Sequence, residues 1–517
     1  MKKPIVFLLS LFCVSALFAQ STYRNPVIPG FHPDPSICRV GNDYYIVNSS
    51  FEYFPGVPIS HSTDLVNWKQ IGNVLNRESQ LPLKGTSSWT GIYAPTLRYN
   101  AGTWYMITTN VGNGGNFMVT ATSPEGPWSD PIWLDQKGID PSLYFEDGKC
   151  YMCSNPGDAI WLCEIDAKTG KQLTESKKLW SGDGGRYPEG PHIYKKDGFY
   201  YLLISEGGTE LAHHLTIARS KNIYGPYESN PANPILTNCN MLGQNSQIQG
   251  TGHGDFVQSP DGSWWLTFLA YRNFGGLYHH LGRETYIAPV EWKVGGWPVV
   301  NGGQPIDTLM KAKLPNNAKQ TLADVTVNGV DANDPGWLYI QNKKAGSYSF
   351  ENGKARLYAN GSLIKNENPT FIGRRQMSEK VMMEAEVTPH ESDTASVSSE
   401  FGLCAYQIND GYFSMYVQDN QVYVCCRLKS AEALSDGYML PEGNEKVKLR
   451  IRSDGNMYYF DVAEEGQSYH QIAAHNCSII STEVAGGFTG VVLGMYVGGL
   501  NKDAYADFDK FVYKELK

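Results

Sequence analysis

Short apolar, aromatic-rich segments separated by glycine-containing turns recur through residues 22–306 of the chain. Each unit starts with a polar or small residue, continues as a short apolar stretch, turns at a glycine and returns as an aromatic-rich run. An Asp-Gly pair between two apolar runs is a strong signal for a β-hairpin. Helical periodicity is almost absent, so the pattern predicts an all-β chain. The five units start at Asp34, Ala94, Asp140, Glu189 and His253.

The spacing of these units indicates how the strands are grouped. Roughly 45 to 65 residues separate successive units, which is enough for the four strands and turns of a propeller blade. We therefore expect a five-bladed β-propeller over residues 22–306. A β-sandwich is the alternative for many short strands, but the repeat argues against it in this part of the chain.

The pattern changes after residue 306. Residues 307–327 lack the repeat and are expected to form a connector. From 328 to 517 the strands alternate polar and apolar positions without the unit, as in Val381–Val387 and Lys448–Arg452, which predicts a β-sandwich (jelly-roll-like) accessory domain. The connector is poor in Ser, Gly and Pro, unlike a flexible tether. We therefore expect the sandwich to be a structural partner that shapes one rim of the pocket.

Residues 1–19 have the pattern of a signal peptide. Lys2 and Lys3 precede the apolar run from Ile5 to Phe18, and Ala19-Gln20 offers a cleavage point. No later segment is apolar for long enough to span a membrane. The sequence predicts a secreted, periplasmic protein.

Charge and cysteine content narrow the classes of partner. With 43 basic and 52 acidic residues the net charge is −9, which repels polyphosphates, so no nucleic acid is expected as a partner. A neutral ligand such as a sugar fits this balance. Cys150 and Cys153 lie three apart in an expected strand and face opposite sides, so they cannot chelate one ion; buried free thiols are expected.

Three of the five unit-leading positions are carboxylic acids: Asp34, Asp140 and Glu189. The innermost strand of each blade lines the central channel, so these positions converge. Clustered carboxyl groups raise each other's pKa, which separates an acid from a base, as glycoside hydrolysis requires. Glu189 stands one position earlier relative to its proline than the two aspartates do, and a β-bulge would compensate. The alternative is that the aspartates cap turns and Glu189 is a surface charge.

Several motifs together resemble glycoside hydrolase family 43, over the chain from about Tyr23 to its end. They are Asn25-Pro-Val-Ile-Pro-Gly-Phe-His-Pro-Asp-Pro-Ser-Ile, Asp64-Leu-Val-Asn-Trp, Gly91-Ile-Tyr-Ala-Pro, Gly138-Ile-Asp-Pro-Ser-Leu, Glu189-Gly-Pro-His-Ile, Gly252-His-Gly-Asp, Leu281-Gly-Arg-Glu-Thr, Ala288-Pro-Val-Glu-Trp and, in the second domain, Phe371-Ile-Gly-Arg-Arg-Gln.

The resemblance implies a role for each matching residue. Asp34 resembles the general base that activates water, and Glu189 the general acid that protonates the departing oxygen. Asp140 resembles the carboxylate that orients the acid and modulates its pKa. His253 resembles a histidine at the channel floor, beside water or, in some members, a calcium ion. Arg283 resembles an arginine that contacts the sugar; the alternative is a salt bridge to Glu284 or another neighbour.

Phe31, Trp89 and Tyr93 are expected to supply apolar walls for a sugar ring. Members that resemble β-xylosidases often have Trp where this chain has Tyr93, which affects the shape of the pocket. The loops Phe51–Pro58 and Gly112–Phe117 are expected to rise around the channel, leaving a pocket that admits one terminal sugar.

Together these observations predict an exo-acting inverting glycoside hydrolase without an organic cofactor. The expected activity releases terminal α-L-arabinofuranosyl residues from plant hemicellulose side chains or oligosaccharides, such as arabinoxylan or xyloglucan. β-D-xylosidase activity on xylo-oligosaccharides, or dual activity, is the alternative. A non-catalytic sugar-binding propeller is a third hypothesis, but a lectin has no need of three convergent carboxyl groups.

Overall fold

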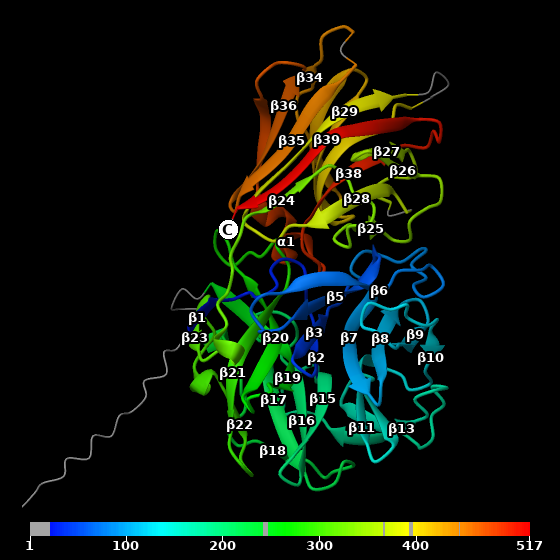
Figure 1. Cartoon of the computed structure of the whole chain (residues 1–517). Helices are drawn as coiled ribbons and strands as arrows, with labels where there is room; N and C mark the ends of the chain where they lie inside the picture. The colour runs from blue at the N-terminus through cyan, green and yellow to red at the C-terminus, as the bar shows by residue number, and fades with distance from the viewer. Residues whose placement is uncertain (1–20, 241–246, 366–367, 392–396, 444, 517) are drawn as a thin grey trace, which may run out of the picture.

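Two all-β domains are stacked end on end in the computed structural model, which describes residues 21–240, 247–365, 368–391, 397–443 and 445–516 (Figure 1). The N-terminal domain is a five-bladed β-propeller and the C-terminal domain is a β-sandwich, so the predicted fold class is confirmed. The predicted signal peptide, residues 1–19, lies outside the described residues.

Each blade is a four-stranded antiparallel sheet whose first strand lies innermost. The blades are β2(Ser36–Val40)–β3(Asp43–Val47)–β5(Gly56–Ser62)–β6(Lys69–Leu75), β7(Gly91–Asn100)–β8(Thr103–Val111)–β9(Gly115–Ala121)–β10(Ile132–Trp133), β11(Ile139–Glu146)–β12(Lys149–Asn155)–β13(Ile160–Ile165)–β14(Lys177–Trp180), β15(Glu189–Lys196)–β16(Phe199–Glu206)–β17(His214–Ser220)–β18(Glu228–Ser229) and β19(Ile248–Gln258)–β20(Trp264–Arg272)–β21(Glu284–Trp292)–β22(Pro298–Val300).

The Asp-Gly signals in the sequence form the tight turns that they predict. Asp147-Gly148 joins β11 to β12, and Asp197-Gly198 joins β15 to β16. All four residues have positive φ, between 49° and 80°, as a two-residue type I′ hairpin turn requires. Apolar side chains then alternate into the spaces between blades, so that Cys150 and Cys153 lie in different core clusters. The nine cysteines among the described residues are free.

Asp255 ties the innermost strands together near the propeller axis. This buried carboxylate, two residues along β19 from His253, accepts hydrogen bonds from Ser36 Oγ of blade 1 at 2.8 Å and Tyr194 OH of blade 4 at 2.6 Å. Arg98 Nη1 of blade 2 donates to the same carboxylate at 2.9 Å. One side chain therefore fixes four blades relative to each other around the channel. The ends of the domain are joined by pairing of β1(Ser21–Arg24) with β23(Leu309–Ala312).

The sandwich consists of two sheets packed face to face around a large apolar core. In the described residues one sheet holds β26(Tyr348–Glu351), β27(Lys354–Tyr358), β39(Tyr505–Leu516), β29(Lys380–His390), β35(Val447–Asp454), β36(Met457–Glu464) and β37(His470–Asn476), with β24(Val325–Asn328) paired to β39. The other holds β28(Thr370–Arg375), β38(Val492–Gly498), β30(Glu400–Ile408), β31(Gly411–Gln418), β32(Gln421–Leu428) and β33(Ala431–Leu434), with β34(Tyr438–Met439) paired to β32. The short helix α1(Thr482–Ala485) precedes β38 on the side that faces the propeller (Figure 1).

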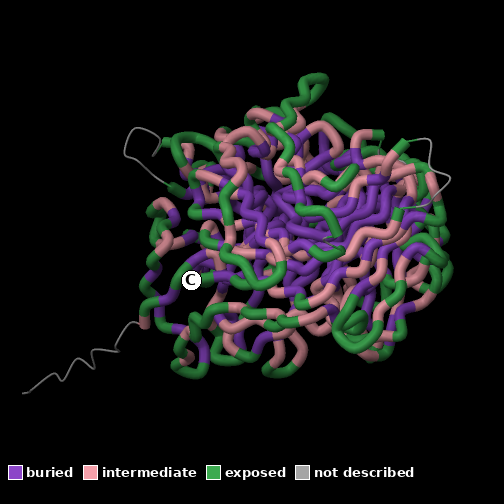
Figure 2. Tube along the Cα trace, turned by 90° about the horizontal axis from the view of Figure 1, so that it is seen from above, coloured by how far each residue is buried: buried purple, intermediate pink, exposed green. Residues whose placement is uncertain are grey.

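The two domains share hydrogen bonds and an apolar cluster. β4(Tyr53–Phe54) of the propeller pairs antiparallel with β25(Tyr339–Ile340), and the segment expected as a connector, residues 307–327, pairs with the propeller through β23 and with the sandwich through β24. Figure 2 shows that buried segments run through the middle of the molecule while exposed turns lie at its edges. The domains are therefore held together as one body at the end of the channel where the pocket opens.

Candidate active site

Three carboxyl groups from three blades meet in a small pocket at the end of the channel that the sandwich covers. Asp34 lies just before β2, Asp140 is in β11, and Glu189 is the first residue of β15. The pocket has a cavity volume of about 90 Å³. Its lining residues are Asp34, Phe51, Tyr93, Ile139, Asp140, Glu189, Thr209, His253, Arg283 and Phe488.

The one-residue offset of Glu189 in the repeat is real and is absorbed by a bulge. Asp34, Asp140 and Gly190 each precede a proline and have φ of 53°, 53° and 60°, so they are the equivalent positions. Strand register shifts just after Ile139 in β11 and just after Glu189 in β15. Glu189 is therefore equivalent to Ile139, and both line the pocket. The bulge allows two consecutive positions of β15 to face the site. Glu189 lines the pocket, and the N–H of the next residue, Gly190, donates to Asp140 Oδ2 at 3.1 Å.

Asp34 is held in its charged form. Ser49 Oγ donates to its Oδ2 at 2.6 Å, and Arg283 Nη1 donates to its Oδ1 at 3.0 Å. Burial alone would raise the pKa of Asp34, but the charges of Arg283 and His253 and the Ser49 hydrogen bond lower it below its usual value. A carboxylate with its lone pairs directed into a pocket can accept a proton from water.

The pKa values of Glu189 and Asp140 are shifted in the opposite direction, upward. Burial, followed by the charges of Asp140 and Asp34, raises the pKa of Glu189 well above its usual value. Burial and Asp34 also raise the pKa of Asp140, against the influence of His253 and the Gly190 N–H. The pocket therefore holds a charged carboxylate and a protonated carboxyl group at one pH, the combination that acid–base hydrolysis requires.

Arg283 and His253 complete the polar part of the pocket. Arg283 Nη1 also donates to Thr209 Oγ1 at 2.9 Å, whereas Glu284, the alternative partner considered for Arg283, pairs with Arg272 at 2.8 Å. His253 Nδ1 lies 3.7 Å from Asp34 Oδ1.

The surroundings of His253 bear on the expectation of calcium. Calcium takes six to eight oxygen ligands, and within the described ranges no three His, Cys, Asp or Glu side chains are grouped to hold a metal ion. Side chains of these types in the described part of the chain do not form a calcium shell by themselves, and calcium beside His253 stays a prediction.

The aromatic walls differ from those expected. Tyr93 lines the pocket, as expected. Phe31 is fully buried and does not line it; its ring packs behind Phe51, with centroids 5.7 Å apart, and Phe51 takes the wall position. Trp89 lies one layer outside the lining, 40% exposed, with its ring edge to face against Phe488 at 5.4 Å. The assignment of Phe31 as a direct wall is therefore corrected: the motif places it in the interdomain core.

Phe51, Ile139, Thr209 and Phe488 line the pocket but were not named among the expected site residues. Phe51 begins a loop that was expected to rise around the channel. Ile139 could have been found from its repeat position. Phe488 comes from the loop between α1 and β38 of the sandwich, and no local pattern could reveal a contact made across domains. It is the residue through which the sandwich forms part of the pocket wall.

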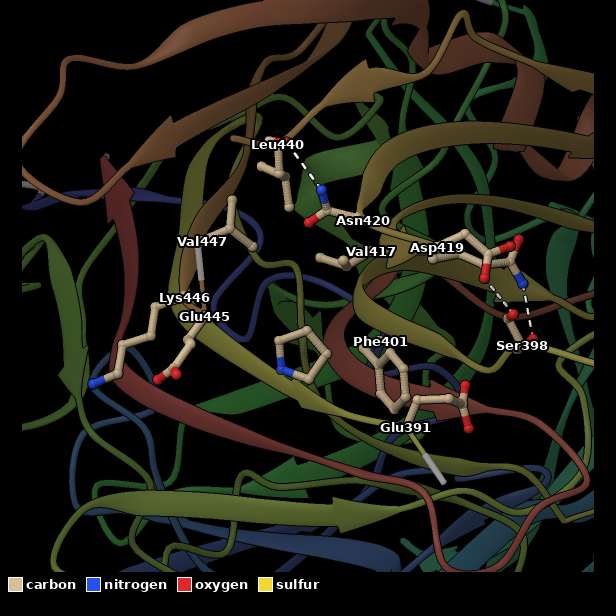
Figure 3. A pocket seen from close by; sticks show the side chains of 12 residues that line it. Glu391, Ser398, Phe401, Val417, Asp419, Asn420, Leu440, Glu445, Lys446 and Val447 are labelled. Carbon is tan, nitrogen blue, oxygen red and sulfur yellow. Dashed lines mark hydrogen bonds between the residues drawn. The ribbon is translucent and has the colours of Figure 1, made fainter. Parts of the chain in front are cut away.

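A second hollow lies at one end of the sandwich and is lined by residues of that domain alone (Figure 3). Its cavity volume is about 210 Å³. Asn420 Nδ2 donates to the carbonyl of Leu440 at 3.0 Å, and the Asp419 carboxylate accepts a bond from Ser398. These polar side chains are thus bonded within the domain, and none of the three convergent carboxyl groups lies there. The chemistry belongs to the propeller pocket.

Comparisons with known proteins agree with this geometry. Residues 23–298 match the family model described as Glycosyl hydrolases family 43, and residues 331–514 match the Beta xylosidase C-terminal Concanavalin A-like domain. The chain is 39% identical to the "Non-reducing end alpha-L-arabinofuranosidase BoGH43B" of Bacteroides ovatus, covering 99% of this chain and 98% of that protein. It is 37% identical to a "Xylosidase/arabinosidase" of Butyrivibrio fibrisolvens, covering 95% and 99%.

Solved structures extend the likeness to the whole fold. "Bacteroides ovatus Xyloglucan PUL GH43B" superposes with a TM-score of 0.88 at 37% identity, over 96% of this chain and 100% of that one. The GH43 protein BlXynB of Bacillus licheniformis superposes with a TM-score of 0.87 at 34% identity, over 95% and 99%. Both domains are therefore shared with these proteins.

Proposed function

Since this chain belongs to glycoside hydrolase family 43 and is a glycosidase, we propose that it is an exo-acting, inverting α-L-arabinofuranosidase. It removes terminal α-L-arabinofuranosyl residues from hemicellulose side chains or oligosaccharides. The observation that carries the choice of sugar is the likeness, over nearly the full length of both chains, to the Bacteroides ovatus protein named as an arabinofuranosidase.

In the proposed mechanism, Asp34 takes a proton from a water that attacks the anomeric carbon, while Glu189 donates its proton to the departing oxygen. The opposite displacements of the pKa of these two groups support this division. Asp140 lies beside the acid, and the Gly190 N–H that follows Glu189 in the chain is bonded to it. Attack by water on the face opposite the leaving group inverts the anomeric centre.

The small size of the pocket supports exo action. Phe51, Tyr93 and Phe488 line a cavity of about 90 Å³, a small volume that suits a single terminal sugar residue better than a length of polysaccharide chain. Aromatic walls suit the C–H faces of a sugar ring. The remainder of the substrate then extends outward past Trp89, which is 40% exposed at the rim.

β-D-xylosidase activity, alone or with the first, is the second candidate. The relative from Butyrivibrio fibrisolvens is named for both sugars. Tyr93 stands where β-xylosidases often have tryptophan, so this wall of the pocket is smaller. The Tyr93 hydroxyl donates its hydrogen to the carbonyl of Trp89 at 3.1 Å, which leaves the hydroxyl oxygen free to accept a hydrogen bond from the sugar.

The natural setting follows from two further observations. The solved relative carries the word xyloglucan in its name, which supports arabinosylated plant polysaccharide, xyloglucan or arabinoxylan, as the source of substrate. The pattern of residues 1–19 supports export to the periplasm. Of the residues described, none belongs to a helix long and apolar enough to traverse a bilayer. The proposed reaction uses no organic cofactor.

Two measurements test the proposal. Values of kcat/KM on nitrophenyl α-L-arabinofuranoside and nitrophenyl β-D-xylopyranoside are compared, with Glu189→Gln as the blank for contaminating activity. A higher value on the arabinofuranoside is expected, and a clear preference for the xyloside promotes the second candidate. Proton NMR of the first-formed sugar should show the inverted anomer; a retained anomer overturns the assignment of Asp34 as a base.

A further inference from the structure

His213 lies against Glu189 in a place that the proposed mechanism does not use. It ends the turn before β17, and its side chain is 1% exposed. Its Nε2 is 3.6 Å from Glu189 Oε1, and this nitrogen has no hydrogen-bond partner in the described structure. A buried, unpaired ring nitrogen directed at a candidate acid needs a physical explanation.

The other ring nitrogen fixes which form of the imidazole is present. His213 Nδ1 lies 3.2 Å from the carbonyl oxygen of Gly250, and a carbonyl oxygen can only accept. Nδ1 therefore carries the hydrogen, and in the neutral ring Nε2 is left with a bare lone pair. Burial, with the charges of His253 and Arg283, lowers the pKa of His213 to about 3, against the opposing influence of the Gly250 carbonyl and Asp34. The ring is therefore neutral at pH values well above 3.

We propose that His213 is a positioning residue: a small rotation of Glu189 closes the 3.6 Å gap, and in the free enzyme Nε2 accepts the acid proton of Glu189, keeping it on the carboxyl group until the departing oxygen of the substrate replaces Nε2 as its acceptor. This inference rests on the proposed role of Glu189 as the general acid. A hydrogen bond to the neutral form of a carboxyl group disfavours its charged form. Ionisation of Glu189 would instead set a carboxylate oxygen against the lone pair of Nε2. His213 thus keeps Glu189 protonated and limits the rotation of its side chain.

The packing around the imidazole is built for this position. A Cβ added at Gly252 of β19 would lie 2.2–2.4 Å from three atoms of the ring, so only glycine leaves room for it there. The other charged groups that face Glu189 are Asp140, Asp34, Arg283 and Glu210. These charges act on the Glu189 carboxyl group as a whole, whereas His213 supplies a hydrogen-bond acceptor at one position, beside Oε1.

The test is the pH dependence of kcat/KM on a phenyl glycoside of the preferred sugar, whose poor leaving group makes acid help necessary. The rate falls above the pKa of Glu189, since the acid must be protonated. In His213→Leu this alkaline limb should move down by about one pH unit, the value of one hydrogen bond. In His213→Gln the limb should stay close to wild type, because the amide oxygen can still accept the proton.

Two further variants keep the test decisive. Gly252→Ala displaces the ring without changing its chemistry and should move the limb in the same direction as His213→Leu; it decides the matter if His213→Leu does not fold. His214→Gln, at the next residue and outside the pocket lining, is the matched control and should leave the limb in place. A uniform loss of rate at every pH in His213→Leu and Gly252→Ala, with an unmoved limb, overturns the inference.

Failure of the inference and failure of the proposed function give different results. If Glu189→Gln turns over the phenyl glycoside at the wild-type rate, Glu189 is not the acid and both fall. If Glu189→Gln is inactive while the alkaline limb of His213→Leu stays at the wild-type pH, the acid role stands and the role of His213 alone is overturned.

Discussion

Arg283 of the propeller and Phe488 of the sandwich are in contact in the lining of the pocket, with the guanidinium carbon 5.7 Å from the ring centroid. The same guanidinium lies 5.7 Å from the ring of Phe51 and donates to Asp34. A cation at this distance from two aromatic faces is attracted to both. Phe488 thus helps to hold the cation that keeps Asp34 charged, so the sandwich acts on the electrostatics of the site as well as on its shape.

We expect Phe488→Ala to lower kcat/KM by about 10-fold to 100-fold, the effect of 1–3 kcal/mol of lost contact with the transition state. Phe488 is only partly buried, so the fold should persist, as circular dichroism can check. Leu500→Ala, an exposed apolar position of the same domain, is the control. Equal kinetics in Phe488→Ala and wild type would remove Phe488 from the substrate site.

Glu189→Gln and Asp34→Asn should each lower kcat by about 10² to 10⁴-fold, because each removes one proton-transfer group. The loss in Glu189→Gln should shrink as the leaving group improves, since a good leaving group needs no proton. Initial rates on a series of aryl glycosides measure this. Glu228→Gln in β18, a largely exposed carboxylate of the same blade, is the control. A loss in Glu189→Gln that is independent of the leaving group would contradict the acid assignment.

The pH profile of kcat/KM should be a broad bell. The pKa of Asp34 is lowered, so its protonation ends activity only below the usual range of an aspartate. The pKa of Glu189 is raised, so its ionisation ends activity well above the usual range of a glutamate. Arg283→Met removes the cation beside Asp34 and should move the acidic limb to higher pH. Rates between pH 3 and 9 on one substrate provide the check; an acidic limb that moves downward would refute the ion pair as its cause.

Glu52 gives the protein a pH-dependent stability. This side chain is fully buried, accepts the Trp89 N–H at 3.0 Å, and has its pKa raised to about 8 by burial. A raised folded-state pKa means that the stabilisation is complete below about pH 4.5 and is lost as pH rises to about 8. Over that window the free energy of unfolding should fall by about 1.4 kcal/mol per pH unit from this group.

Glu52→Gln keeps an acceptor for the Trp89 N–H and removes the titration. Its melting temperature should therefore exceed that of wild type at pH 8 and approach it at pH 5. Asp130→Asn, a surface carboxylate paired with Arg77, serves as the control for a general charge effect. The same pH slope of melting temperature in wild type and Glu52→Gln would show that Glu52 ionises freely.

Tyr93→Trp should shift the ratio of kcat/KM on arabinofuranoside and xyloside toward the xyloside, by about 10-fold, because a larger wall favours the flatter pyranose ring. Tyr93→Phe distinguishes the effect of the hydroxyl on the choice of sugar from the effect of ring size, because it keeps the six-membered ring and removes only the hydroxyl and its hydrogen bond to the Trp89 carbonyl. A ratio that is unchanged in Tyr93→Trp would place the choice of sugar elsewhere in the pocket.

The catalytic carboxyl groups could be predicted from the sequence because each stands at or next to the same position of a repeat unit. Asp34, Asp140 and Glu189 lead their units, and propeller geometry brings such positions to one axis, so the sequence alone predicts their convergence. The offset of Glu189 was also visible, although only the positive φ of Gly190 explains it. Phe31 was misplaced because a motif residue three positions before a catalytic one can belong to the core. Phe488 was beyond reach because its contact depends on how two domains dock, which no local pattern encodes.

The contribution of Phe488 also sets an order on biosynthesis. The propeller strands leave the ribosome long before residue 488 is added, and β39, which lies between β27 and β29 in the middle of a sandwich sheet, is made later still. A nascent chain can therefore assemble its three carboxyl groups while one wall of the sugar site is missing. The sugar pocket is therefore complete only once the sandwich has docked on the propeller, because its carboxyl groups belong to the first domain and Phe488 belongs to the second.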